Sequence, residues 1–282
     1  MKFAICNETF GDWTHERAFA LAAECGYAGI EIAPFTLAAA RPDGTCDVDD
    51  VTAQARDEVR RLAKSHGLEV VGLHWLLAKT QGFYLTSPDA EVRRRTAEYL
   101  GTLARLCRDL GGRVMVLGSP RQRNLLPGVS LAQATRHAQS VIEAILPELE
   151  ACEVTLALEP LGPAEGDFWT TAAEAVQTIE RIGSPHVRLH LDVKAMSSEA
   201  RPIPEIIREN APHLAHFHAN DPNLQGPGFG EVDFAPILAA LAEIDYQGWV
   251  SVEVFDYSPG PERLARESIE YLQKCVSAIG CD

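Results

Sequence analysis

Residues 154–192 read VTLALEPLGPAEGDFWTTAAEAVQTIERIGSPHVRLHLD, and this stretch decides the fold class. It begins and ends with short runs rich in β-branched and apolar residues, VTLALEP (154–160) and VRLHLD (187–192). Between them, TTAAEAVQTIERIG (170–183) has apolar residues at helical spacing, and Gly183 stands where a helix would end. The stretch therefore predicts a strand, a helix and a second strand, which is the unit of parallel α/β folds.

The same unit repeats along the rest of the chain. The other predicted strands are KFAIC (2–6), GIEIA (29–33), EVVGLHW (69–75), RVMVLG (113–118), LAHFHA (214–219) and WVSVEVF (249–255). Helical patterns lie between them, and the one over 87–111 has Ser87 as its expected N-cap and Pro88 at its first position. Eight strands alternating with eight helical patterns predict an α/β fold, a (β/α)8 TIM barrel forming one domain over residues 1–282. A doubly wound open sheet is the alternative, but no G-x-G-x-x-G follows the first strand.

The composition is typical of a globular protein of a reducing compartment. The chain has 282 residues, of which 46 % are hydrophobic, and a formal net charge of −15. This charge repels nucleic acid, so we expect no nucleic-acid partner. Seven scattered cysteines without a C-x-x-C pair argue against a disulfide framework and a zinc knuckle. The N-terminus is too polar for a signal peptide and no apolar run is long enough to span a membrane, so we expect a cytosolic protein without a membrane partner.

Four residues that can bind a metal stand at the ends of the last four predicted strands. They are Glu159, Asp192, His218 and Glu253. The active site of a parallel barrel lies at the carboxyl ends of its strands, so we expect these side chains to meet there. Three carboxylates buried together would raise one another's pKa, and a divalent cation removes that repulsion.

The donor set also indicates the kind of ion. Three carboxylates and one imidazole are mainly hard, oxygen-rich ligands, which suit Mn²⁺, with Mg²⁺ or Co²⁺ as alternatives, better than a thiolate zinc site. His216 lies two residues before His218 and therefore one layer deeper in the barrel, where we expect a hydrogen-bonded core residue.

The strand ends LALEP, HLD, HFHAN and VEV, in this order, resemble those of the xylose isomerase-like TIM barrels. The closest branch is the sugar-phosphate isomerase/epimerase superfamily that includes the D-tagatose and D-psicose 3-epimerases, and KFAICNETF and GYAGIEIA are similar to its first two strands. The resemblance implies that Glu159, Asp192, His218 and Glu253 hold one divalent metal ion and that the two glutamates, Glu159 and Glu253, are catalytic and transfer protons. It also implies a homo-oligomer, because barrels of this branch are often dimers or tetramers.

The chain departs from the ketose 3-epimerase pattern at two positions. Ala195 stands where those enzymes usually have a histidine, three residues after the aspartate ligand, and Leu224 stands where they place an arginine. Glu165 does match the position of a substrate-contacting glutamate. The resemblance thus implies that the metal site is kept and that part of the substrate clamp is replaced.

Further residues are candidates for substrate contact. His74 and Trp75 follow the third strand, Lys194 follows Asp192 and either points into the mouth or extends into solvent, and Asp221 lies in a loop after the seventh strand. We expect Asp221 to meet substrate hydroxyls and Trp75 to form an apolar wall. In GSPRQR (118–123), Arg121 and Arg123 can reach an anionic group or only water.

These residues predict a metal-dependent sugar isomerase or epimerase whose substrate is a small sugar or keto-polyol. One of Glu159 and Glu253 would abstract a proton next to a carbonyl, giving a metal-stabilised ene-diolate, and the other would return a proton. The main alternative is a lyase that uses the same intermediate, an inosose-type dehydratase or a 3-keto-glycoside-cleaving enzyme. The negative charge disfavours an apurinic-site endonuclease, and the intact ligand set disfavours a non-catalytic sugar-binding barrel.

Overall fold

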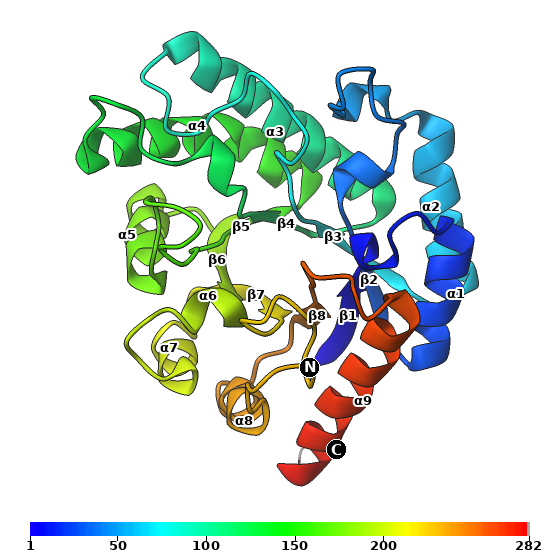
Figure 1. Cartoon of the computed structure of the whole chain (residues 1–282). Helices are drawn as coiled ribbons and strands as arrows, with labels where there is room; N and C mark the ends of the chain where they lie inside the picture. The colour runs from blue at the N-terminus through cyan, green and yellow to red at the C-terminus, as the bar shows by residue number, and fades with distance from the viewer. Residues whose placement is uncertain (281–282) are drawn as a thin grey trace.

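The computed structural model describes residues 1–280, which form a closed barrel of eight strands in the order β1 to β8. All neighbouring strands are parallel, and Figure 1 shows them at the centre with helices around them. The strands are β1 (Lys2–Cys6), β2 (Gly29–Ile32), β3 (Glu69–Leu73), β4 (Val114–Leu117), β5 (Thr155–Leu158), β6 (Val187–Asp192), β7 (Leu214–Ala219) and β8 (Trp249–Val252). The predicted α/β (β/α)8 barrel is confirmed.

Helices connect successive strands around the outside of the barrel (Figure 1). They are α1 (His15–Cys25), α2 (Ala53–Ser65), α3 (Ala90–Leu110), α4 (Leu131–Cys152), α5 (Ala172–Ile182), α6 (Val193–Met196), α7 (Ile203–Glu209), α8 (Ala235–Glu243) and α9 (Pro261–Ala278), with short 3-10 turns η1 (Asn7–Phe10), η2 (Pro34–Thr36), η3 (Val48–Asp50) and η4 (Pro120–Gln122). Gly183 ends α5 in the left-handed region with φ 66°, as predicted. The expected N-cap at Ser87 is wrong, because α3 begins at Ala90 and Asp89 caps it by accepting the backbone N–H of Glu91. Among residues 1–280, no helix combines the length and apolar character needed to cross a membrane.

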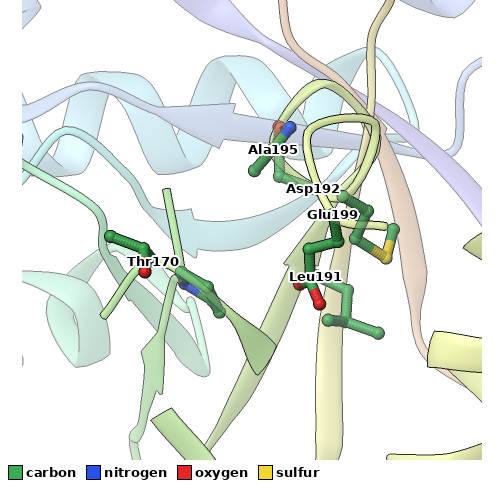
Figure 2. A pocket seen from close by; sticks show the side chains of 7 residues that line it. Thr170, Leu191, Asp192, Ala195 and Glu199 are labelled. Carbon is green, nitrogen blue, oxygen red and sulfur yellow. Dashed lines mark hydrogen bonds between the residues drawn. The ribbon is translucent and has the colours of Figure 1, made fainter. Parts of the chain in front are cut away.

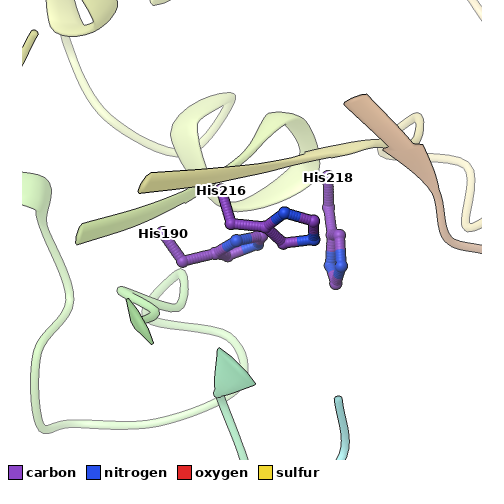
Figure 3. Close-up of side chains that lie close together, drawn as sticks. All are labelled: His190, His216 and His218. Atoms are coloured by element: carbon purple, nitrogen blue, oxygen red, sulfur yellow. The ribbon is translucent and has the colours of Figure 1, made fainter. Parts of the chain in front are cut away.

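Side chains alternate between the two sides of the strands. Leu189, Leu191 and Phe217 are buried and join the large hydrophobic core that also includes helix residues. On the other side of β6 and β7, the rings of His190, His216 and His218 lie against one another inside the barrel (Figure 3). The barrel interior is therefore polar toward the ends of these strands.

Two strand pairs shift register directly below polar residues of the site. Between β6 and β7, Leu189 pairs with Leu214 but His190 pairs with His216, so Ala215 is passed over. As a result, Asp192 pairs with His218 and both side chains face the same side. A similar shift between β2 and β3 brings Glu31 opposite Gly72. A Cβ atom on residue 72 would lie 1.8 Å from the carbonyl oxygen of Val114 on β4. Only glycine permits this approach of β3 to β4.

Several predicted strands extend past the observed ends. β3 ends at Leu73, so His74 and Trp75 belong to the following loop, and Trp75 has a left-handed backbone with φ 52°. β5 ends at Leu158 and β8 at Val252, which places Glu159 and Glu253 at the first loop position after each strand. The strand ends thus deliver these side chains to the mouth of the barrel.

Candidate active site at the carboxyl ends of the strands

Three of the four predicted metal ligands meet at one point in the barrel mouth. The carboxylates of Glu159 and Asp192 and the imidazole of His218 form a group with His190 in which the ligand atoms all lie within 4.8 Å of one another. All four residues are buried. The structure therefore brings the ends of β5, β6 and β7 together, as predicted.

Glu253, the fourth predicted ligand, lies beside this group. Its Oε2 atom is 3.0 Å from Nδ1 of His218, and its Oε1 atom accepts a hydrogen bond of 2.6 Å from the indole N–H of Trp75. By geometry, His190 takes the fourth place in the group. Its Nε2 atom lies 3.9 Å from Glu159 Oε1, and neither ring nitrogen has a hydrogen-bond partner among residues 1–280 (Figure 3).

The electrostatics of this group fit a divalent cation. Burial raises the pKa of Glu159 well above its ordinary value, and the charges of Glu253 and Asp192 raise it further. Burial and Glu253 likewise raise the pKa of Asp192 to about 6. The pKa of His190 is lowered well below its ordinary value by burial and by His218 and His216, which favours a neutral imidazole with one ring nitrogen able to bind a metal. Converging carboxylates and an unpartnered neutral imidazole are the donors that a bound cation would satisfy.

Asp192 is oriented by two groups outside the predicted set. Its Oδ1 atom accepts the backbone N–H of Ala195 at 2.8 Å, and the amide of Asn220 donates to its Oδ2 atom. The other end of the Asn220 amide accepts the backbone N–H of Lys194 at 2.8 Å. Asn220 is not among the residues predicted from the sequence, although its position directly after the end of β7 is the signal that could have identified it.

The space behind Asp192 is closed. Figure 2 shows Thr170, Leu191, Ala195 and Glu199 around its side chain, and the gap they line has no room for a water molecule. This gap therefore offers no room for a ligand beside Asp192.

Glu31, on β2, supports the site from the opposite side of the barrel. Its carboxylate lies 2.8 Å from Nε2 of His216 and 3.2 Å from Nε2 of His218. Burial alone would raise the pKa of Glu31, but the two histidines hold it well below its ordinary value. His216 is thus a buried, hydrogen-bonded residue one layer below His218, as predicted.

His74 belongs to a second buried cluster and does not line the cavity. Its Nε2 atom lies 2.6 Å from Oε2 of Glu8, and the ring is fully buried. Burial would lower the pKa of His74, but Cys6 and Glu8 raise it well above its ordinary value. The structure thus places this predicted substrate contact behind the site.

A cavity of about 540 Å³ opens beside the carboxylates. Glu159 and Glu253 line it together with the predicted contacts Trp75, Glu165 and Lys194 and with Ala78, Lys79, Thr80, Gly118, Ser119, Pro120, Arg121, Gln122, Leu161 and Phe255. Lys194 donates a 2.6 Å hydrogen bond to Glu165, and its ammonium group lies 4.2 Å from the ring centroid of Phe255. The rings of Trp75 and Phe255 are stacked, with centroids 5.9 Å apart. The cavity thus combines an apolar wall with a charged pair, which is typical of small-molecule sites.

Two other residues considered from the sequence face elsewhere. Asp221 accepts the backbone N–H groups of Asn223 at 3.2 Å and Val232 at 3.0 Å, so its carboxylate holds its own loop together and is absent from the cavity lining. Arg123 is buried, and its guanidinium donates to the main-chain oxygens of Glu159 at 2.6 Å and Leu117 at 3.3 Å. It therefore ties the ends of β4 and β5, and burial lowers its pKa to about 10.

Comparison with known families identifies a match over most of the chain. The model of the family described as xylose isomerase-like TIM barrel matches residues 19–275. This confirms the resemblance found in the strand ends.

Known relatives of similar sequence include sugar 3-epimerases. An L-ribulose 3-epimerase of Mesorhizobium japonicum is 31 % identical over 190 residues, which cover 65 % of this chain and 62 % of the relative. A D-psicose 3-epimerase of Enterocloster bolteae is 37 % identical over 106 residues, which cover 38 % of this chain and 35 % of the relative. Each match therefore spans less than two thirds of the relative's own length.

Solved structures show the same fold. A D-psicose 3-epimerase crystallised in the presence of D-fructose has a TM-score of 0.83 at 22 % identity, covering 98 % of this chain and 99 % of that one. A 3-keto-D-glucoside 4-epimerase from Escherichia coli also has a TM-score of 0.83, at 21 % identity. The superposition covers 98 % of this chain and 100 % of that one.

Proposed function

Because this chain belongs to the xylose isomerase-like TIM-barrel family, we propose that it is a divalent-metal-dependent enzyme that isomerises or epimerises a small sugar or keto-polyol next to its carbonyl group. The observation that carries this proposal is the buried meeting of Glu159, Asp192 and His218, with Glu253 beside them, at the wall of a cavity of about 540 Å³. The relatives named above are sugar 3-epimerases, which supports the same reaction class.

Glu159, Asp192, His218 and Glu253 would hold the metal ion, and His190 is close enough to add a donor. The oxygen-rich set favours Mn²⁺, with Mg²⁺ or Co²⁺ as alternatives. When bound, such an ion polarises a substrate carbonyl and an adjacent hydroxyl, which acidifies the neighbouring C–H bond.

In this proposal, the two glutamates move the proton. Glu159 follows β5 and Glu253 follows β8, and both line the cavity, so they reach a bound sugar from different strands of the barrel. One takes the proton from the carbon next to the carbonyl and the other returns a proton. Return to the same carbon inverts it, which is epimerisation, and return to the neighbouring carbon exchanges the positions of carbonyl and hydroxyl.

Other cavity residues orient the substrate. Trp75 fixes one carboxylate oxygen of Glu253 through its 2.6 Å hydrogen bond and, with Phe255, offers an apolar wall that excludes water. The Glu165–Lys194 pair presents one acceptor and one donor to sugar hydroxyls. His74 and Asp221 support the loops around this cavity.

A lyase remains the second candidate because the usual substrate clamp is altered. Ala195 offers only its backbone N–H, which binds Asp192, and Leu224 is 43 % exposed and lies outside the cavity lining. Loss of a leaving group from the same deprotonated substrate needs no change in Glu159 or Glu253.

The test is proton NMR of ketoses, inososes and 3-keto glycosides incubated in D₂O with the Mg²⁺-loaded protein. We expect metal-dependent deuterium incorporation at one carbon without loss of a fragment, and its loss in Glu253→Gln. Glu270→Gln, an exposed glutamate on α9, is the matched control. Release of water or an aglycone would establish the lyase, and no exchange with any substrate despite metal binding would refute the proposed reaction.

Location, assembly and domain limits stay predictions from the sequence. All six cysteines within residues 1–280 are free, which supports the proposed cytosolic location. A homo-oligomer and a single domain over residues 1–282 are tested by sedimentation and limited proteolysis.

A further inference from the structure

Part of the cavity wall carries positive charge that the proposed reaction does not use. Lys79, in the loop after β3, and Arg121, in η4 after β4, both line the cavity with exposed side chains. Within residues 1–280, neither cation forms an ion pair with a carboxylate. The glutamates of the cavity are engaged elsewhere, because Glu159 and Glu253 belong to the ligand set and Glu165 is paired with Lys194.

The two cations stand on loops that are hydrogen-bonded to each other. Ser119 Oγ accepts the backbone N–H of Leu77 at 3.1 Å. Leu77 lies two residues before Lys79, and Ser119 lies two residues before Arg121. The carbonyl of Gln122 accepts the backbone N–H of Leu85 at 2.7 Å. These bonds hold the loops after β3 and β4 side by side, so Lys79 and Arg121 belong to one stretch of the wall.

Lys79 is held in place rather than free in solvent. Its backbone is in the left-handed region with φ 56°, and its carbonyl accepts the N–H of Cys46 at 2.8 Å. Its ammonium group lies 4.2 Å from the ring centroid of Phe35, and this ring is 5.8 Å from that of Trp75. A strained backbone and a cation over an aromatic ring indicate a positioned charge next to the apolar wall of the site.

A sugar with hydroxyl groups alone would cover these charges without pairing them. Covering a cation without a counter-charge costs free energy, whereas an arginine or lysine bound to a carboxylate or phosphate makes charge-assisted hydrogen bonds. We infer that the substrate is a keto sugar that carries an anionic group, a carboxylate or a phosphate, on a carbon remote from the carbonyl, and that Arg121 and Lys79 bind this group. The inference rests on the proposed function, which places the carbonyl at Glu159 and Glu253.

Three ligands that differ only at carbon 6 test this inference: D-fructose, D-fructuronate and D-fructose 6-phosphate. Binding to the Mg²⁺-loaded protein is followed by calorimetry, and deuterium exchange is recorded in parallel. We expect at least one anionic sugar to bind about tenfold more tightly than D-fructose, with an advantage that shrinks as salt is added. Whichever anion binds better identifies the group as carboxylate or phosphate.

Charge-removing variants then assign the binding to the two residues. Arg121→Gln and Lys79→Gln should each weaken binding of the preferred anion about tenfold and leave D-fructose unchanged. Arg136→Gln, on the outside of α4, is the matched control and should change neither. Two separate variants keep the test valid if one of them fails to fold.

The outcomes separate this inference from the proposed function. Equal binding of all three sugars, or an anion preference that survives both variants, overturns the inference even if exchange is observed. Preference for an anion that Arg121→Gln abolishes, without exchange in any sugar, supports the anion subsite and overturns the reaction.

Discussion

The two sides of the barrel use polar residues in different ways. At the carboxyl ends of β5 to β8, Asp192 and His218 lie within their strands and Glu159 and Glu253 directly follow theirs, and all four are at the barrel mouth. The strands β1 to β3 and the turns after them contribute Cys6, Glu8, Glu31, His74 and Trp75, which mostly contact other protein groups. Glu31 reaches His218 across the barrel, and Trp75 reaches Glu253. In the proposed function, the side of β5 to β8, called the reactive side below, supplies the reactive groups, and the side of β1 to β3, called the supporting side, orients them.

This division explains why buried charge is tolerated on both sides. On the supporting side, Glu8 pairs with His74 and Glu31 with His216, so each carboxylate has an imidazole partner. On the reactive side, Nε2 of His190 lies 3.9 Å from Glu159 Oε1, too far for a hydrogen bond, and burial together with the charges of Glu253 and Asp192 raises the pKa of Glu159. Charge left uncompensated by the protein is charge available to a bound ion.

The largest expected effect is on the reactive side. Asp192→Asn removes one negative donor and should lower both metal content and activity, the latter roughly 10³-fold, because Lewis-acid assistance contributes several kcal/mol. Elemental analysis of the purified protein and the exchange assay measure the two effects. Asp57→Asn, an exposed residue of α2, should change neither. A fully active Asp192→Asn protein would remove Asp192 from the ligand set.

A smaller effect is expected when the support of His218 is weakened. Glu31→Gln leaves the shape of the site but removes the charge that His216 and His218 contact, and outer-shell changes typically cost 10- to 100-fold in metal affinity or activity. Competition with a fluorescent chelator measures the affinity. Glu69→Gln, at the amino end of β3, is the control. Unchanged affinity and turnover would mean that the two sides of the barrel are independent.

Trp75→Phe tests the support of Glu253. The variant keeps a ring against Phe255 but removes the 2.6 Å hydrogen bond, so we expect kcat to fall about tenfold, with unchanged metal content. Steady-state kinetics separate kcat from KM. If only KM rises, Trp75 contacts the substrate and does not position Glu253. Trp13→Phe, in the loop before α1, is expected to leave both constants unchanged.

The smallest catalytic effect is expected at Asp221, which lies on the reactive side but hydrogen-bonds within its own loop. Asp221→Asn should cost roughly 1–3 kcal/mol of unfolding free energy, since its carboxylate accepts two backbone N–H groups, and leave KM unchanged. Urea denaturation and substrate saturation curves measure these quantities. A large rise in KM with unchanged stability would restore Asp221 as a substrate contact.

The sequence predicts the reactive side better than the supporting side. Glu159, Asp192, His218 and Glu253 are readable because strand ends of a parallel barrel converge on one face, so a pattern within each strand suffices. The contacts of Glu31 with His216 and His218 depend on how the sheet closes across the barrel, and no local pattern contains that information. The same holds for His190, which lies within the ligand group although it is one layer deeper than Asp192 on β6.

Loop residues are the least predictable part. Lys194 and Glu165 form a pair, and Asp221 turns into its own loop, because of hydrogen bonds that depend on how the loops fold. Trp75 was expected as an apolar wall, but its indole N–H also donates to Glu253, and its backbone is left-handed.

The register shift at Ala215 has a consequence for how such a barrel can be recombined. Ala215, the residue without a partner on β6, lies on β7 in the same segment as His216 and His218. A gene fragment that begins between β6 and β7 therefore contains both the register shift and the two histidines that it aligns. The shift below Glu31 is built differently, since the residue passed over, Val71, lies on β3 while Glu31 lies on β2. A chimaera joined between β2 and β3 would therefore take Glu31 from one parent and Val71 from the other. A chimaera joined between β6 and β7 would keep Ala215 with His218, so that His218 stays in register with an aspartate at the end of β6.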